Sequence, residues 1–466
     1  MSRRLGDVPR SRPPERRPAL DVTVTIDDRP VGAVPPPGPA PAAAPREHGQ
    51  GFGAVLRRRD FRLLWAAQAA SQLADKFLML ALIVLVYDLS HRSTLQSLLM
   101  LAYTGPSVVL SAAAGVFADR HDKRALMIGT NLARGGLILL VPLAQVVPYL
   151  RHRAWPLLVV TLAFSCIGQV FAPAEAASIP FLVRRRQLMV ATSLFMTTVI
   201  VTLVAGVPLA SICIKLLGHY VPFFIAGALL GIAALCIWRM NTSLRAQGQA
   251  PRTDVLREMR DGLVILGRHP ALRLALAQLA LSLTVVFTLF ALAPAYIHTV
   301  LRKDDTDTYL LLIPATLGMV AMALLLGHRS GRLSRGRALL AGLAVGGCSL
   351  VAVGLVPDAI KSAGAGLALT PVAVGVSVVF GAALGLLMIP AFTVLQERTD
   401  EQTRGRIFGG IFTVINAAVA LPLLLAGGLA DAFGVDRVIA GLGVILLLVC
   451  AGAILAGRRV LGVLER

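Results

Sequence analysis

Residues 62–88 read RLLWAAQAASQLADKFLMLALIVLVYD, a largely apolar run with a charged residue at each end. Inside the run, only Asp75 and Lys76 carry a charge. At roughly 1.5 Å per residue, a helix of this length exceeds the roughly 30 Å of hydrocarbon in a bilayer. The stretch therefore predicts a membrane-spanning helix with ionisable side chains near its middle.

The rest of the chain repeats this apolar pattern. The 466 residues are 56% hydrophobic and 15% charged, with a mean hydropathy of +0.74, which excludes a water-soluble globular protein. Twelve apolar segments follow residue 60, so we expect an all-α polytopic membrane protein. The predicted spans are 62–88, 94–118, 125–147, 155–180, 189–214, 221–240, 271–298, 308–327, 338–357, 368–396, 407–430 and 437–456.

The basic residues fix the predicted orientation. In a soluble chain, 45 Lys and Arg against 25 Asp and Glu would suggest a nucleic-acid partner, but here their placement argues against one. With the amino terminus placed in the cytoplasm, 27 of the 45 fall on the inner side and eight on the outer side. The positive-inside rule therefore predicts a protein of the cell's inner (plasma) membrane with both termini cytoplasmic.

Two segments lie outside the spans. Residues 1–50 are rich in Arg, Pro and Ala, and we expect a disordered cytoplasmic tail without a signal peptide. The longest internal connection, 241–270, carries apolar residues at helical spacing, which predicts a short amphipathic helix at the inner membrane surface. It separates a predicted six-helix half over 51–240 from a second over 271–466.

The two halves echo each other. Pro173 and Ala174 in the fourth span precede a basic loop, as do Pro390 and Ala391 in the tenth. Two pseudo-symmetric six-helix halves around a cavity are typical of secondary transporters. The sequence contains no G-x-x-x-x-G-K-[ST] motif, so we expect transport driven by a gradient.

The stretch GVFADRHDKRAL (115–126) resembles the loop between spans two and three of the major facilitator superfamily. Asp122 stands where many members have Gly, which resembles the efflux permeases that include enterobactin and macrolide exporters. Residues 71–90, 171–194 and 394–412 support the same subgroup. The resemblance implies the major facilitator fold.

Residues at the predicted inner rim are candidates for a gate. The resemblance implies that Asp119 is a latch that accepts backbone N–H groups at the start of span eleven, near Gly409 and Gly410. Arg120, Lys123 and Arg124 are expected to face anionic lipid headgroups beside it. Alternatively, the loop is only a solvated, positively charged turn. The second-half counterpart, 327–337, has no acidic residue, so a latch would be one-sided. The predicted gate comprises Gly115, Asp119, Arg120, Lys123, Arg124, Arg404, Gly405 and Arg406.

Asp75 is the predicted proton-coupling residue. It continues a polar stripe down the first span, and the resemblance implies that this span lines the cavity. Arg134, in the third span, is a possible basic partner, because charges within hydrocarbon need pairing or water. In the alternative interpretation, Asp75 forms a static pair with Lys76 or Arg134 that only fixes helix packing. The stripe comprises Gln68, Ser71, Gln72 and Asp75.

Two residues of the fourth span complete the candidate cavity. Glu175 stands where the subgroup often has Arg; it would contact Arg184 or Arg186, bind a cationic substrate, or, as we favour, serve as a structural cap. Gln169 is included because fourth spans face the pore in this fold. Span five departs from the exporter pattern, since Val207 interrupts its Gly-Pro pair.

The sequence favours a proton-coupled exporter of amphipathic small molecules such as drugs, siderophores or metabolites. A lipid or lysophospholipid flippase of the same fold and a non-transporting membrane scaffold or sensor remain alternatives. We expect no enzyme activity, metal or cofactor, because no nucleophile constellation or metal-ligand spacing is found in the spans. The expected partners are a small-molecule substrate, protons and membrane lipid, and the expected state is a monomer.

Overall fold

The computed structural model describes residues 52–455, apart from nine gaps. The gaps are 145–146, 148, 150–152, 185–186, 243, 245–269, 329–333, 363–367 and 398–403. The predicted tail over 1–50 and the predicted surface helix within 241–270 therefore lie outside the described residues. Every regular element in the described ranges is a helix.

The first half consists of one short helix and six long ones. Its long helices match the first six predicted spans, with ends that differ by only a few residues. The second half repeats the arrangement, with a 3-10 turn, η2, before its second long helix. The elements are α1 (Phe52–Leu56), α2 (Arg59–Ser90), α3 (Ser93–Arg120), α4 (Lys123–Ala144), α5 (Trp155–Leu182), α6 (Leu188–Leu217) and α7 (Val221–Trp238), then α9 (Pro270–Thr299), η2 (Asp305–Thr308), α10 (Tyr309–His328), α11 (Arg335–Ser362), α12 (Leu369–Glu397), α13 (Arg404–Phe433) and α14 (Val435–Leu455).

Eleven of the twelve long helices in the described chain are apolar and long enough to cross a membrane. The twelfth, α3, spans 28 residues, or roughly 42 Å at 1.5 Å per residue, and lies where the second span is predicted. Two prolines at corresponding places in the halves, Pro173 in α5 and Pro390 in α12, both lie inside helices. The predicted all-α polytopic fold with two six-helix halves is confirmed.

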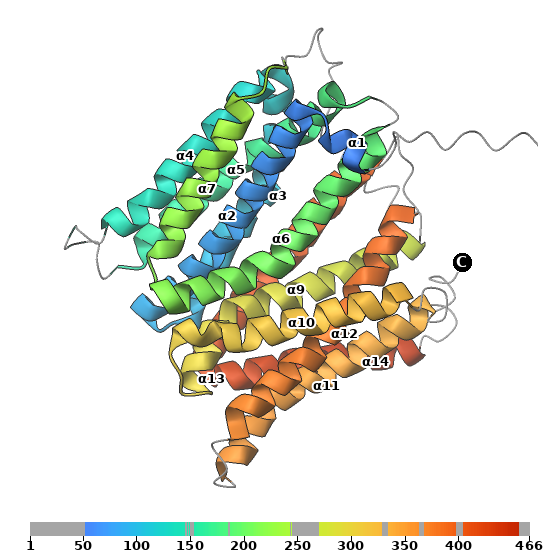
Figure 1. Cartoon of the computed structure of the whole chain (residues 1–466). Coiled ribbons are helices and arrows are strands. Elements are labelled where there is room, and N and C mark those ends of the chain that lie inside the picture. The colour runs from blue at the N-terminus through green and yellow to red at the C-terminus, as the bar shows by residue number, and fades with distance from the viewer. Residues whose placement is uncertain are drawn as a thin grey trace, which may run out of the picture. The chain divides into compact units, whose positions relative to one another are not determined.

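Each half is a bundle of adjacent helices (Figure 1). In the first half, α2 packs against α6 and α7, and α5 packs against α3 and α4. In the second half, α12 packs against α10 and α11, and α14 packs against α11. Across the halves, α3 packs along α13 and α6 contacts α10. These pairs form part of the interface between the two halves.

Glycines set the helix spacing in the second half. A Cβ atom at Gly381 of α12 would overlap the backbone of Ala315 in α10, at 2.8 Å from its Cα. A Cβ atom at Gly443 of α14 would lie 2.7 Å from the carbonyl oxygen of Gly347 in α11. Such distances are shorter than real Cβ contacts, so these helices meet backbone to backbone.

Candidate functional site

Asp75 and Arg134 form an ion pair between α2 and α4 within the membrane-spanning bundle. Asp75 lies roughly 24 Å along the α2 axis from Arg59, well inside the helix. The Arg134 side chain is only 4% exposed, whereas that of Asp75 is 18% exposed. Asp75 is thus the more exposed member of the pair.

Arg134 is enclosed by side chains from three helices. Its Nη1 donates a hydrogen bond to Ser71 Oγ of α2 at 3.3 Å, and Ser71 Oγ lies 3.4 Å from Asn131 Oδ1 of α4. The guanidinium carbon lies 4.1 Å from the ring centroid of Phe164 in α5, a cation–π contact. A Cβ at Gly168 would approach Arg134 Nε to 3.4 Å, so this glycine leaves room for the guanidinium.

The predicted polar stripe of α2 divides between two neighbours. Gln68 is 3% exposed, and its Nε2 donates to the Phe195 carbonyl of α6 at 3.3 Å. Ser71 and Asp75 instead reach α4. Gln72 is half-buried. The structure therefore brings Ser71, Asp75 and Arg134 together and directs Gln68 elsewhere.

The two α5 candidates have separate environments. Gln169 Nε2 donates to the Ser165 carbonyl of its own helix at 3.3 Å. Glu175 is 7% exposed, and its Oε1 has no hydrogen-bond partner among the described residues. Glu175 lies inside α5 rather than at its end, and the favoured capping role stays a prediction. Arg184 is exposed, and no ion pair joins it to Glu175; Arg186 lies outside the described residues.

The loop after α3 holds a helix cap. Asp122 Oδ1 accepts the backbone N–H of Arg124 at 2.9 Å, which caps the first turn of α4. Arg124 Nη2 donates to the Trp238 carbonyl at the end of α7, and Arg120 is exposed. Lys123 is 3% exposed, so the expectation that it faces lipid headgroups was wrong.

The latch itself is not tested by this structure. The Asp119 side chain and the side chains of Arg404 and Arg406 lie outside the described residues, although α3 and α13 include these positions. Gly115 and Gly405 likewise belong to α3 and α13. The inner latch stays a prediction.

The predicted outer end carries a contact that the sequence analysis missed. Asp431, in the last turn of α13, accepts hydrogen bonds from the start of α3 in the other half. Oδ1 accepts the Ser93 N–H at 2.7 Å, and Oδ2 accepts the Thr94 N–H at 2.9 Å and the Thr94 hydroxyl at 2.5 Å. The signal was available, because an acidic residue at the carboxyl end of a helix opposes its own helix dipole.

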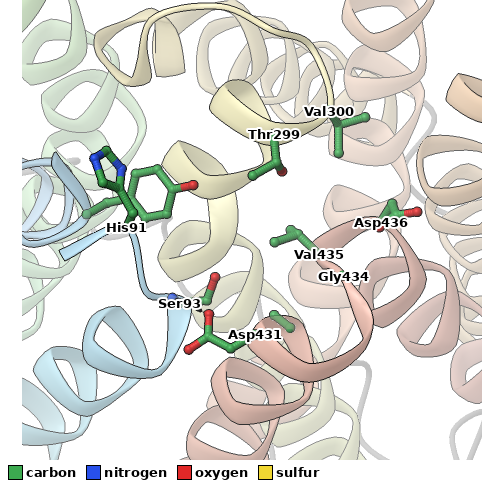
Figure 2. A pocket seen from close by; sticks show the side chains of 10 residues that line it. His91, Ser93, Thr299, Val300, Asp431, Gly434, Val435 and Asp436 are labelled. Carbon is green, nitrogen blue, oxygen red and sulfur yellow. Dashed lines mark hydrogen bonds between the residues drawn. The ribbon is translucent and has the colours of Figure 1, made fainter.

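A cavity of about 290 Å³ adjoins this contact (Figure 2). Its walls come from the end of α2, the start of α3, the end of α9 and the turn between α13 and α14. Nearby, the rings of His91 and His298 stack across the halves with centroids 5.5 Å apart. The lining residues are Tyr87, His91, Ser93, Thr299, Val300, Ala430, Asp431, Gly434, Val435 and Asp436.

A second pair of helices is joined at the same end. Lys215 Nζ of α6 lies 2.8 Å from Asp307 Oδ1 of η2, and Ser211 Oγ lies 3.1 Å from Thr308 Oγ1. Lys215 is one of the eight basic residues that the sequence places on the outer side, but its partner was not foreseen. Contacts on two helix pairs thus hold the halves together at the predicted outer end.

Comparisons with known proteins agree with this architecture. The chain is 25% identical over 387 residues to Macrolide efflux protein A of Streptococcus pyogenes, covering 81% of this chain and 91% of that one. It is 26% identical over 416 residues to the uncharacterized MFS-type transporter YfiS of Bacillus subtilis (strain 168), covering 84% and 92%.

Solved structures share the fold. The nucleoside transporter NupG superposes with a TM-score of 0.65 at 12% identity, covering 85% of this chain and 99% of that one. A bacterial homolog of the human lysosomal transporter Spinster, in an inward-facing and unoccupied conformation, gives 0.65 at 14% identity, covering 87% and 98%. Residues 64–423 match the Major Facilitator Superfamily, and the chain is a multi-pass membrane transporter that belongs to this family.

Proposed function

We propose that this transporter exports amphipathic small molecules from the cytoplasm across the plasma membrane in exchange for protons. The observation that carries the proposal is the ion pair of Asp75 with Arg134, because it is the one place where the described helices bury a charge pair at mid-span depth. A titratable carboxylate beside a fixed cation can exist in two states, paired or protonated. The name of the relative, Macrolide efflux protein A, supports export as the direction.

The unequal exposure of the two partners suggests how a proton acts. Asp75 is the more exposed partner, so a proton can reach its carboxylate while Arg134 stays buried. Protonation removes the negative charge beside Arg134, whose guanidinium also contacts Ser71 Oγ and the Phe164 ring. The relative positions of α2 and α4 would then respond, and α2 contacts both α6 and α9. This coupling is a route from one proton to the interface between the halves.

The test measures proton flux in proteoliposomes that contain the purified full-length chain. Erythromycin serves as a macrolide probe and ethidium as an amphipathic cation. We expect the wild type to move protons when a probe is added. The proton flux of Asp75→Asn should be lower by roughly tenfold or more. Asp88→Asn is the matched control, because it makes the same change on the same helix at a side chain that is 48% exposed.

A second variant separates coupling from folding. Asp75→Asn combined with Arg134→Leu removes both charges of the pair, so Arg134 is not left buried without a counter-ion while the carboxylate is still absent. It should also lose proton flux. The coupling proposal is refuted if either variant transports a probe with undiminished proton movement, or if the wild type transports a probe without moving protons.

A further inference from the structure

We propose that Asp431 and Gly427 form an outer clasp, which holds the predicted outer mouth closed while the transporter faces inward. The clasp consists of the Asp431 carboxylate, the first turn of α3 at Ser93 and Thr94, and the close seat of Gly427 on that turn. The inference rests on the proposed alternating-access function and adds to it a specific gating element.

The carboxylate contact joins the two halves directly. Asp431 belongs to α13 in the second half, whereas Ser93 and Thr94 begin α3 in the first half. Both carboxylate oxygens are used, on two backbone N–H groups and one hydroxyl. The first N–H groups of a helix lack partners within the helix, so an acid from elsewhere satisfies them and complements the helix dipole. Figure 2 shows Ser93 and Asp431 side by side.

The packing at Gly427 is an independent observation. A Cβ there would lie 2.6 Å from Ser97 Cβ and 2.7 Å from the Ser93 carbonyl oxygen. Only a glycine allows α13 to lie this close to α3. By contrast, a Cβ at the neighbouring Gly428 would meet no atom within 4 Å. The chain thus offers its own matched control one residue away.

The exposure of Asp431 suits a contact that opens in each cycle. The Asp431 side chain is exposed to solvent at the outer end, so water can replace its hydrogen bonds when the halves part. A fully buried ion pair would resist opening, because both charges would lose their partners.

The clasp also mirrors the predicted inner latch. There, Asp119 at the carboxyl end of α3 would cap the start of α13; here, Asp431 near the carboxyl end of α13 caps the start of α3. The same two helices would therefore exchange roles at the two membrane faces. When the bundles rock, one cap forms as the other is lost.

The experiment measures a distance, without substrate or proton gradient. Nitroxide labels are placed at Leu98 of α3 and Arg437 of α14, both exposed, in a variant lacking the native cysteines. Distances are recorded by double electron–electron resonance in nanodiscs of phosphatidylethanolamine and phosphatidylglycerol. We expect Asp431→Ala and Gly427→Ala each to increase the long-distance population roughly three- to tenfold, a range set by the usual strength of helix caps.

Graded variants make the result specific. Asp431→Asn should have a smaller effect, because an amide oxygen still accepts one N–H, and Thr94→Val should have a smaller effect still. Gly428→Ala should match the wild type. Unchanged distances in folded Asp431→Ala and Gly427→Ala, or in Thr94→Val if those two fail to fold, would overturn the clasp. Because no transport is measured, this result is independent of whether proton coupling holds.

Discussion

The two halves of this transporter differ in the contacts that join their helices. The first half buries a charged pair, Asp75 with Arg134, inside its helices. The second half has no Asp, Glu, Lys or Arg in 274–297, 309–327, 338–357, 369–396, 407–430 or 438–455. Its helices instead meet at glycines such as Gly381 and Gly443. The first half thus has an ion pair between its helices, whereas helices of the second half meet backbone to backbone.

Removing one charge of the ion pair should have the largest effect on the stability of the first half. Asp75→Asn leaves Arg134 buried without a counter-ion, and breaking a buried pair in this way costs about 3–5 kcal/mol. Arg134→Leu should cost less, because the more exposed Asp75 retains access to water or a proton. The double variant should be more stable than Asp75→Asn alone. Unfolding of each purified protein in an SDS titration measures these free energies.

The view that buried Arg134 needs Asp75 as its counter-ion would be contradicted by either of two results. The two single variants could be equally destabilised, or the double variant could be no more stable than Asp75→Asn. In that event the pair would contribute little to the stability of the first half, and the contrast with the second half would weaken.

Adding a single methyl group at a close helix contact should destabilise the second half. Gly381→Ala places a Cβ against the backbone of Ala315, and we expect a loss of about 1–3 kcal/mol from overpacking. Gly375→Ala on the same helix is the control, since a Cβ there meets no atom within 4 Å. The same SDS titration compares the two. If both substitutions have the same effect, close helix contact is not what holds this half together.

The smallest expected effect concerns the loop motif. Asp122→Ala removes the cap of α4 and should cost about 1 kcal/mol, whereas Asp122→Asn should cost much less because Asn is also a good cap. This order would show that Asp122 acts as a local helix cap in the first half. An Asn variant as unstable as the Ala variant would instead point to a role for the charge itself.

The fold could be predicted from the sequence because hydropathy and the placement of Lys and Arg are properties of single segments. It also raised the pairing of Asp75 with Arg134, since few charged residues occur within the spans. It could not choose among partners, because the rotation of α2 against α4 and α6 depends on packing. That rotation sends Gln68 to α6 and Ser71 to α4.

The contacts at the outer end could not be predicted from the sequence for a related reason. Asp431 and Ser93 are 338 residues apart, and no periodicity in either segment brings them together. Lys215 and Asp307 look like ordinary loop charges until the halves are docked. Glu175 was placed correctly in the fourth span, but its burial was not foreseen.

The close helix contacts at Gly318, Gly381 and Gly443, here called the glycine seams, have a consequence for how the protein changes under selection. Where backbones touch, there is no side chain to trim or enlarge, so nearly every replacement at Gly318, Gly381 or Gly443 would push two helices apart. We expect variants with altered cargo preference to accumulate around α2, α4 and α5 and to be scarce along these seams. The molecule would then adapt on one side while the other is inherited almost unchanged.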